Sequence, residues 1–153
     1  MDKVQQSIPT MLAVAGVIFL FCWALGMWLY RRRKALREKE FDHLEGHEFE
    51  LYCADLLKRK GFDEIEVTKG SGDFGADILA QKDGVTYAIQ CKCYTSPVGV
   101  KAVQEAYAGR DYYDRMVGAV LTNQYFTAPA VEAASKLKIL LWDRGYLEMM
   151  EEE

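Results

Sequence analysis

The 153-residue chain has little histidine, little proline and no excess of positive charge. Its only histidines are His43 and His47, and its Cys91-x-Cys93 pair has no second Cys or His pair after it. This spacing argues against a zinc site and favours cysteines that pack as small buried hydrophobic side chains. The net charge of −4 gives no overall attraction for nucleic acid, so any such binding would need a local basic patch. Neither an internal repeat nor a low-complexity segment is visible.

The most apolar part of the sequence is the run from Met11 to Tyr30, which contains no charged residue. A helix of that length spans about 30 Å, the thickness of the hydrocarbon core of a bilayer. The basic cluster Arg31-Arg32-Arg33-Lys34 follows the run directly. Since positive charge stays on the cytoplasmic side, the pattern predicts a single-pass anchor in the inner or plasma membrane with the C-terminal domain in the cytoplasm.

The domain organisation follows from this reading. We expect a short extracytoplasmic N-terminus, a transmembrane helix, a basic, charged helical stalk, a folded domain and an acidic tail. These segments cover residues 1–10, 11–30, 31–45, 46–150 and 151–153.

The folded domain has the hydrophobic patterns of an α/β protein. In chain order these patterns predict helix, three strands, helix, strand, helix and strand, with a final turn of helix. The second and third strands form a hairpin around Lys82-Asp83-Gly84, and later strands are linked by helical crossovers. The fold class is therefore a mixed sheet flanked by helices, antiparallel at the hairpin and parallel at the crossovers.

Three polar side chains interrupt the otherwise apolar hairpin. Alternate residues of a strand share a face, so Gln90 and Lys92 project together from the less apolar side of the second hairpin strand. Asp77, at the start of the first hairpin strand, can reach the same side. The glycines of the preceding segment 69–75 allow something to approach that carboxylate closely.

This set of side chains is typical of phosphodiester hydrolysis. Asp77 offers Mg²⁺ (or Mn²⁺) a charged oxygen, and either the Gln90 amide oxygen or the backbone carbonyl of Cys91 completes the ligand set. Lys92 orients or helps deprotonate the attacking water, and it offsets the charge that grows on the phosphorus oxygens.

Other residues extend this candidate site. On the predicted helix 46–60, Glu50 lies nearer the apolar stripe than Glu48, so Glu50 is the favoured additional carboxylate, although the sequence leaves the choice open. Lys69 and Lys101 flank the site in the sequence and are the favoured contacts to DNA phosphates.

The same residues resemble the Mrr-like restriction endonuclease family, within the PD-(D/E)xK nuclease group. The resemblance rests on Gly46-His-Glu-Phe-Glu50, Gly70-Ser-Gly-Asp-Phe-Gly-Ala-Asp77 and Gln90-Cys-Lys92, which is the Gln-x-Lys form of the last motif. It implies a restriction-endonuclease-like fold and metal-dependent cleavage of DNA by Asp77, Gln90 and Lys92. It also assigns Glu50 to the site, and it places Asp73 just outside the metal ligands.

Two functional hypotheses follow. The first is a membrane-anchored, metal-dependent DNA endonuclease, for which a homodimer is an option because one such site cuts one strand. The second is a catalytically silent nuclease-like module that binds nucleic acid or a protein partner at the membrane.

Overall fold

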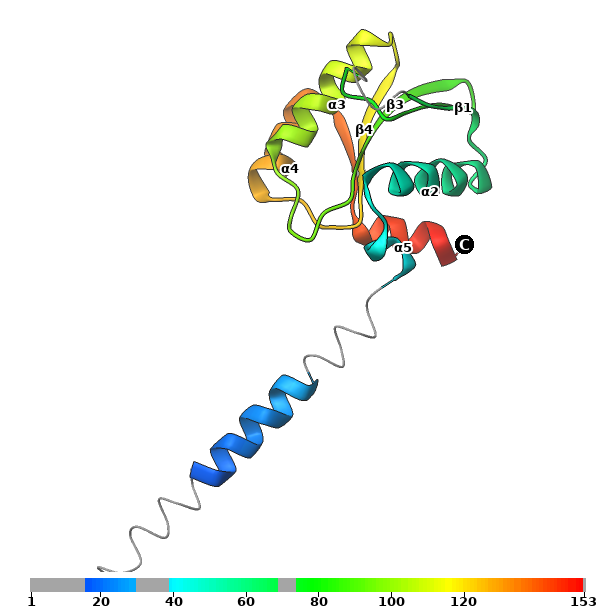
Figure 1. Cartoon of the computed structure of the whole chain (residues 1–153). Coiled ribbons are helices and arrows are strands. Elements are labelled where there is room, and N and C mark those ends of the chain that lie inside the picture. Colours follow the sequence, from blue (N-terminus) through cyan, green and yellow to red (C-terminus); the bar gives the residue numbers. More distant parts are fainter. Residues whose placement is uncertain (1–15, 30–38, 69–73, 153) are drawn as a thin grey trace, which may run out of the picture. The chain divides into compact units, whose positions relative to one another are not determined.

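The computed structural model describes residues 16–29, 39–68 and 74–152 (Figure 1). The chain divides into two units, Met1–Lys39 and Glu40–Glu153. Lys69 and Asp73 lie outside the described residues.

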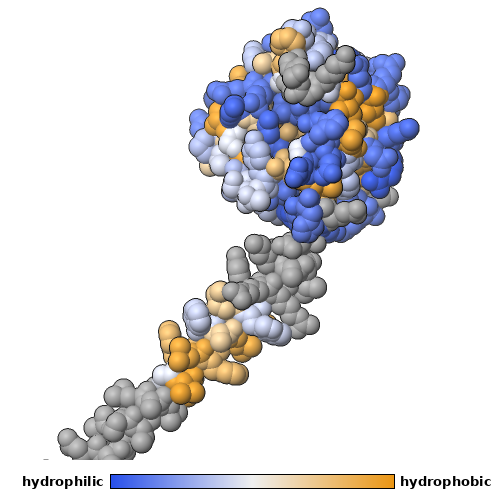
Figure 2. All heavy atoms as spheres, viewed as in Figure 1, coloured by the Kyte–Doolittle hydropathy of each residue, from blue (hydrophilic) through white to orange (hydrophobic). Residues whose placement is uncertain are grey.

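In the first unit, the described residues form one helix over residues 16–29. Its large apolar side chains, among them Phe19, Phe21 and Trp23, are exposed (Figure 2). Within the described parts of the chain, no helix is both long enough and apolar enough to cross a membrane. The predictions of a transmembrane helix over residues 11–30 and of a single-pass membrane location are therefore wrong.

The second unit is built on a five-stranded sheet in the order β1-β2-β3-β4-β5. The first three strands pair antiparallel, and β4 and β5 add to β3 in parallel. Asp83 and Gly84 both have positive φ, which suits the tight turn between β2 and β3. The strands are β1 (Asp63–Val67), β2 (Ile78–Lys82), β3 (Val85–Lys92), β4 (Val117–Thr122) and β5 (Ile139–Trp142).

Helices cover both faces of this sheet (Figure 1). The crossover helices α3 and α4 pack on one face, while α2 and α5 pack on the other. The helical elements are η1 (Glu40–His43), α2 (Gly46–Arg59), α3 (Val100–Tyr112), α4 (Ala128–Leu137) and α5 (Arg144–Glu152). This mixed α/β arrangement fits the expected restriction-endonuclease-like fold.

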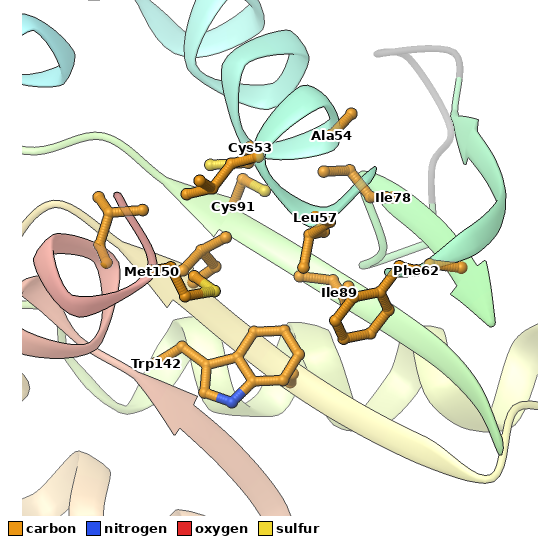
Figure 3. Packing of buried hydrophobic residues seen from close by; sticks show 14 of the residues in the cluster. Cys53, Ala54, Leu57, Phe62, Ile78, Ile89, Cys91, Trp142 and Met150 are labelled. Atoms are coloured by element: carbon orange, nitrogen blue, oxygen red, sulfur yellow. The ribbon is translucent and has the colours of Figure 1, made fainter. Parts of the chain in front are cut away.

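The alternation of β3 decides which residues face which layer. Ile89 and Cys91 lie in the core under α2, beside Cys53 and Leu57 (Figure 3). Their neighbours Gln90 and Lys92 must then project toward the opposite face, which α3 covers.

The short turn η1 is part of this second unit. Phe41 is fully buried in the core under α2 and α5. Arg144 of α5 makes two hydrogen bonds to the Asp42 carboxylate, at 2.7 and 2.8 Å, and its guanidinium lies over the Phe41 ring. This ion pair holds η1, at the start of the second unit, against the C-terminal helix α5.

Candidate active site

Asp77 and the end of β3 form the centre of the candidate site. Asp77 immediately precedes β2 and is only 4% exposed. Its Oδ2 accepts a hydrogen bond from the Gln90 side-chain amide and a second, at 2.7 Å, from the Cys91 backbone N–H. The pairing of Ile78 with Ile89 in the hairpin brings these groups together. The structure brings Asp77 and Gln90 into contact, and their role in a shared site stays a prediction.

The oxygens at this centre suit a hard divalent cation. The Gln90 Nε2 lies near Asp77 Oδ2 and also 3.4 Å from the backbone carbonyl oxygen of Cys91. Two acceptor oxygens therefore converge on the amide end of a buried glutamine. An amide carries an acceptor oxygen as well as a donor nitrogen, so Gln90 can offer a third oxygen there. Carboxylate, amide and backbone carbonyl oxygens are the ligands that Mg²⁺ takes.

His, Cys, Asp and Glu side chains alone do not make a metal site here. Across residues 16–29, 39–68 and 74–152, no three of these side chains gather in a way that could hold an ion. A cation at this point would depend on the Gln90 amide and the Cys91 carbonyl in addition to Asp77.

Lys92 has a carboxylate partner that sequence reasoning missed. Its Nζ lies 2.9 Å from Oε2 of Glu105 on α3. Burial lowers the pKa of Lys92, but the hydrogen bond and charge of Glu105, helped by Tyr94 and Asp77, outweigh it and raise the pKa above its ordinary value. Lys92 is thus an ammonium at neutral pH. This favours a role in offsetting negative charge over a role in deprotonating water.

Glu50 pairs with a residue of its own helix. Its carboxylate lies 2.9 Å from His47 Nδ1. A contact with Cys53, followed by burial, raises the pKa of the Cys91 thiol, and the charges of Asp77 and Glu50 add to the effect. Both carboxylates therefore lie near Cys91.

Glu48, the alternative candidate for the site carboxylate, caps the start of α2. Its Oε2 accepts a hydrogen bond from the Glu45 backbone N–H at 3.1 Å, which is half of a capping box at the start of α2. The role of Glu50 in the site remains a prediction, as does that of Asp73.

Of the two lysines predicted to contact DNA, Lys101 lies among the described residues and Lys69 does not. Lys101 is on the first turn of α3 with a side chain that is 87% exposed, and its Nζ lies 3.6 Å from Glu105 Oε1. It is thus held loosely beside the Lys92–Glu105 pair. Lys69 is among the residues that are not described.

Gly75, two residues before Asp77, lies against helix α3. A Cβ on Gly75 would lie 2.1 Å from the backbone oxygen of Glu105, and a Cβ on Gly109 would lie 2.5 Å from the backbone oxygen of Gly75. Gly75 therefore touches α3 backbone to backbone. No pattern in the sequence marked this contact in advance.

Two buried polar residues at the end of β4 hold the backbone around Lys92. Thr122 Oγ1 donates to the Lys92 carbonyl at 2.6 Å. The Asn123 side chain accepts from Tyr94 N–H at 2.9 Å and donates to Tyr94 C=O at 3.1 Å. The signal that could have revealed them is a Thr-Asn pair directly after an apolar strand that runs parallel to β3.

Comparison with known proteins agrees with this fold. The restriction endonuclease family model Mrr_cat matches residues 41–150, so the chain belongs to this family. The domain is accordingly a restriction-endonuclease-like nuclease domain. No curated protein matches the chain.

Three solved structures are similar to the chain. AF1548, described as a protein of unknown function, is 26% identical with a TM-score of 0.56 and covers 66% of this chain and 62% of its own. The MspJI restriction endonuclease, solved with a 27-mer oligonucleotide, is 19% identical with a TM-score of 0.53, and the match covers 81% of this chain and 30% of MspJI. The DNA modification-dependent restriction endonuclease AspBHI is 20% identical with a TM-score of 0.51, covering 67% of this chain and 29% of AspBHI. The two enzymes support the fold alone, and this chain spans less than a third of either.

Proposed function

We propose that the chain is a metal-dependent DNA endonuclease that hydrolyses phosphodiester bonds at Asp77, Gln90 and Lys92. Membership of the restriction endonuclease family supports the reaction and the substrate. The observation that supports the assignment of residues is the convergence of Asp77 Oδ2 and the Cys91 carbonyl on the Gln90 amide, two residues before Lys92, which pairs with Glu105.

The metal ligands would be the Asp77 carboxylate, the Gln90 amide oxygen and the Cys91 backbone carbonyl. A bound Mg²⁺ or Mn²⁺ would supply positive charge to the phosphate oxygens and lower the pKa of water at the site. Asp77 is suited to this because it is buried and already held by two hydrogen bonds, so little reorganisation is needed.

The chain's own contribution to the reaction centres on Lys92. Its ammonium, held beside Glu105, would offset the negative charge that develops on the phosphorus oxygens. The exposed Lys101, and Lys69, which precedes the site in the sequence, would contact neighbouring phosphates of the DNA backbone. A homodimer, which would bring two such sites to the two strands, remains a prediction.

The test is incubation of the full chain with plasmid, linear and single-stranded DNA, with Mg²⁺, with Mn²⁺ and with EDTA. Cleavage should need the cation and should fall at least a hundredfold in Lys92→Ala, since an electrostatic group at the reacting phosphate is worth about that much. Lys101→Ala serves as the comparison and should weaken DNA binding with a smaller effect on the rate constant. Binding of DNA with no cleavage under any of these conditions would instead favour the silent nuclease-like module.

A further inference from the structure

Helix α3 contributes a carboxylate to the site, and no expectation from the sequence gave it a role. Glu105 lies on the side of α3 that packs over β3, and its Oε2 is buried. Apart from the Lys92 ammonium at 2.9 Å, this oxygen has no hydrogen-bond partner among the described residues. The other oxygen, Oε1, faces the exposed Lys101 at 3.6 Å.

We propose that Glu105 is a positioning residue of the nuclease site, which fixes where the Lys92 ammonium lies. The inference rests on the proposed function, in which the Lys92 ammonium stabilises the reacting phosphate. Glu105 itself acts through Lys92 and touches neither the DNA nor the cation.

The backbone of Glu105 is fixed more firmly than that of an ordinary helical residue. Gly75 packs directly against its carbonyl group, so closely that no side chain would fit, and Gly109 one turn further along makes the same kind of contact with Gly75. Gly75 is two residues before Asp77. The contact therefore ties the carboxylate that holds Lys92 to the segment that leads into Asp77.

The backbone of Lys92 is also fixed, from the opposite side. Thr122 donates to its carbonyl, and Asn123 binds both polar backbone groups of Tyr94. With its main chain held by β4 and its ammonium held by Glu105, Lys92 has little freedom left along its flexible side chain. A lysine fixed at both ends is preorganised for a charge that develops nearby.

The direction of the Lys92 pKa agrees with this close contact. Burial lowers the pKa, while the hydrogen bond and the charge of Glu105 raise it above its ordinary value.

The direct test is the mobility of the Lys92 side chain in the full-length chain, measured by ¹³C NMR relaxation at Cε in wild type and in Glu105→Gln. We expect a lower order parameter at Cε in Glu105→Gln, because the ammonium loses the carboxylate that holds it. The matched control is Asp111→Asn, which removes an exposed carboxylate from the same helix and should leave Lys92 unchanged. An unchanged order parameter of Lys92 in Glu105→Gln would overturn the proposal.

Cleavage assays give a second, separate readout. Glu105→Gln should lower kcat about tenfold with little change in KM for DNA. Glu105→Asp keeps the charge on a shorter side chain, so kcat should still fall because the ammonium is displaced. A rise in the Mg²⁺ concentration needed for half-maximal rate in Glu105→Gln, with no change in the mobility of Lys92, would make Glu105 a metal ligand and refute the positioning role.

The two proposals can fail separately. If wild type cleaves no DNA, the proposed function fails, whereas the NMR relaxation measurement still decides whether Glu105 holds Lys92. If wild type cleaves DNA but Lys92 is equally ordered with and without the Glu105 carboxylate, only the positioning role is lost.

Discussion

Replacing Gly109 by alanine tests the contact between α3 and the segment before Asp77. A Cβ at this position would lie 2.5 and 2.6 Å from the backbone oxygen and carbon of Gly75, and 2.9 Å from the Ala76 Cβ. Backbone atoms cannot rotate out of the way, so the helix and the loop would have to separate. An overpacked site of this kind destabilises a protein by about 1–3 kcal/mol, and we expect the upper end because two of the three close atoms are backbone.

Helix propensity acts in the opposite direction. Alanine in the interior of a helix is about 1 kcal/mol more favourable than glycine. The net expectation for Gly109→Ala is therefore a loss of about 2 kcal/mol in the free energy of unfolding. Urea unfolding of the full-length chain, followed by circular dichroism, measures it.

The control is Gly46→Ala at the start of α2, where an added Cβ meets nothing within 4 Å. That variant should be as stable as wild type to within about 0.5 kcal/mol. Gly109→Ala should also lose cleavage activity under conditions where it is fully folded, because the displaced helix carries Glu105 away from Lys92. A Gly109→Ala variant with the stability and activity of wild type would refute the argument that this contact positions the site.

Three further outcomes follow from the structure. Asp42→Asn should destabilise the chain by about 2 kcal/mol in urea unfolding, because it weakens a largely buried, doubly hydrogen-bonded pair with Arg144. Glu148 is the more exposed partner of Arg144, so Glu148→Gln should cost less than about 1 kcal/mol. Equal losses in the two variants would contradict this. Glu50→Gln should slow DNA cleavage at least tenfold if Glu50 belongs to the site, while Glu48→Gln should affect only stability, and the reverse pattern would assign the site carboxylate to Glu48. The Lys92–Glu105 pair should stabilise the fold fully below pH 10.5, and its contribution should be lost as the pH rises through the higher pKa of Lys92 in the folded state. The free energy of unfolding of wild type should therefore not fall relative to that of Glu105→Gln between pH 7 and pH 10.

Much of the domain follows from local patterns in the sequence. The Asp83-Gly84 turn between two apolar runs predicts the β2–β3 hairpin, and helices between the later strands predict the parallel part of the sheet. Once the hairpin is recognised, strand alternation puts Gln90 and Lys92 on one side, with Asp77 in reach. The structure has this arrangement because the pairing of Ile78 with Ile89 fixes the register.

The features that sequence reasoning missed depend on contacts between distant segments. The direction in which Glu105 faces is set by the rotation of α3, which depends on its backbone contact with Gly75 and not on any period in its own sequence. Similarly, Thr122 and Asn123 act on β3 only because β4 lies beside it. The membrane span predicted from the apolar run at residues 11–30 is contradicted, because none of the helices among the described residues is long and apolar enough to cross a membrane.

The most direct measurement of the central claim is the metal dependence of DNA cleavage by wild type and by Asp77→Asn. Asparagine keeps the shape of the side chain but removes the charge that would hold the cation. We predict cleavage by wild type with Mg²⁺ or Mn²⁺, none with EDTA, and a loss of at least a hundredfold in Asp77→Asn. Cleavage by Asp77→Asn at the wild-type rate, or cleavage by wild type that persists in EDTA, would contradict the account.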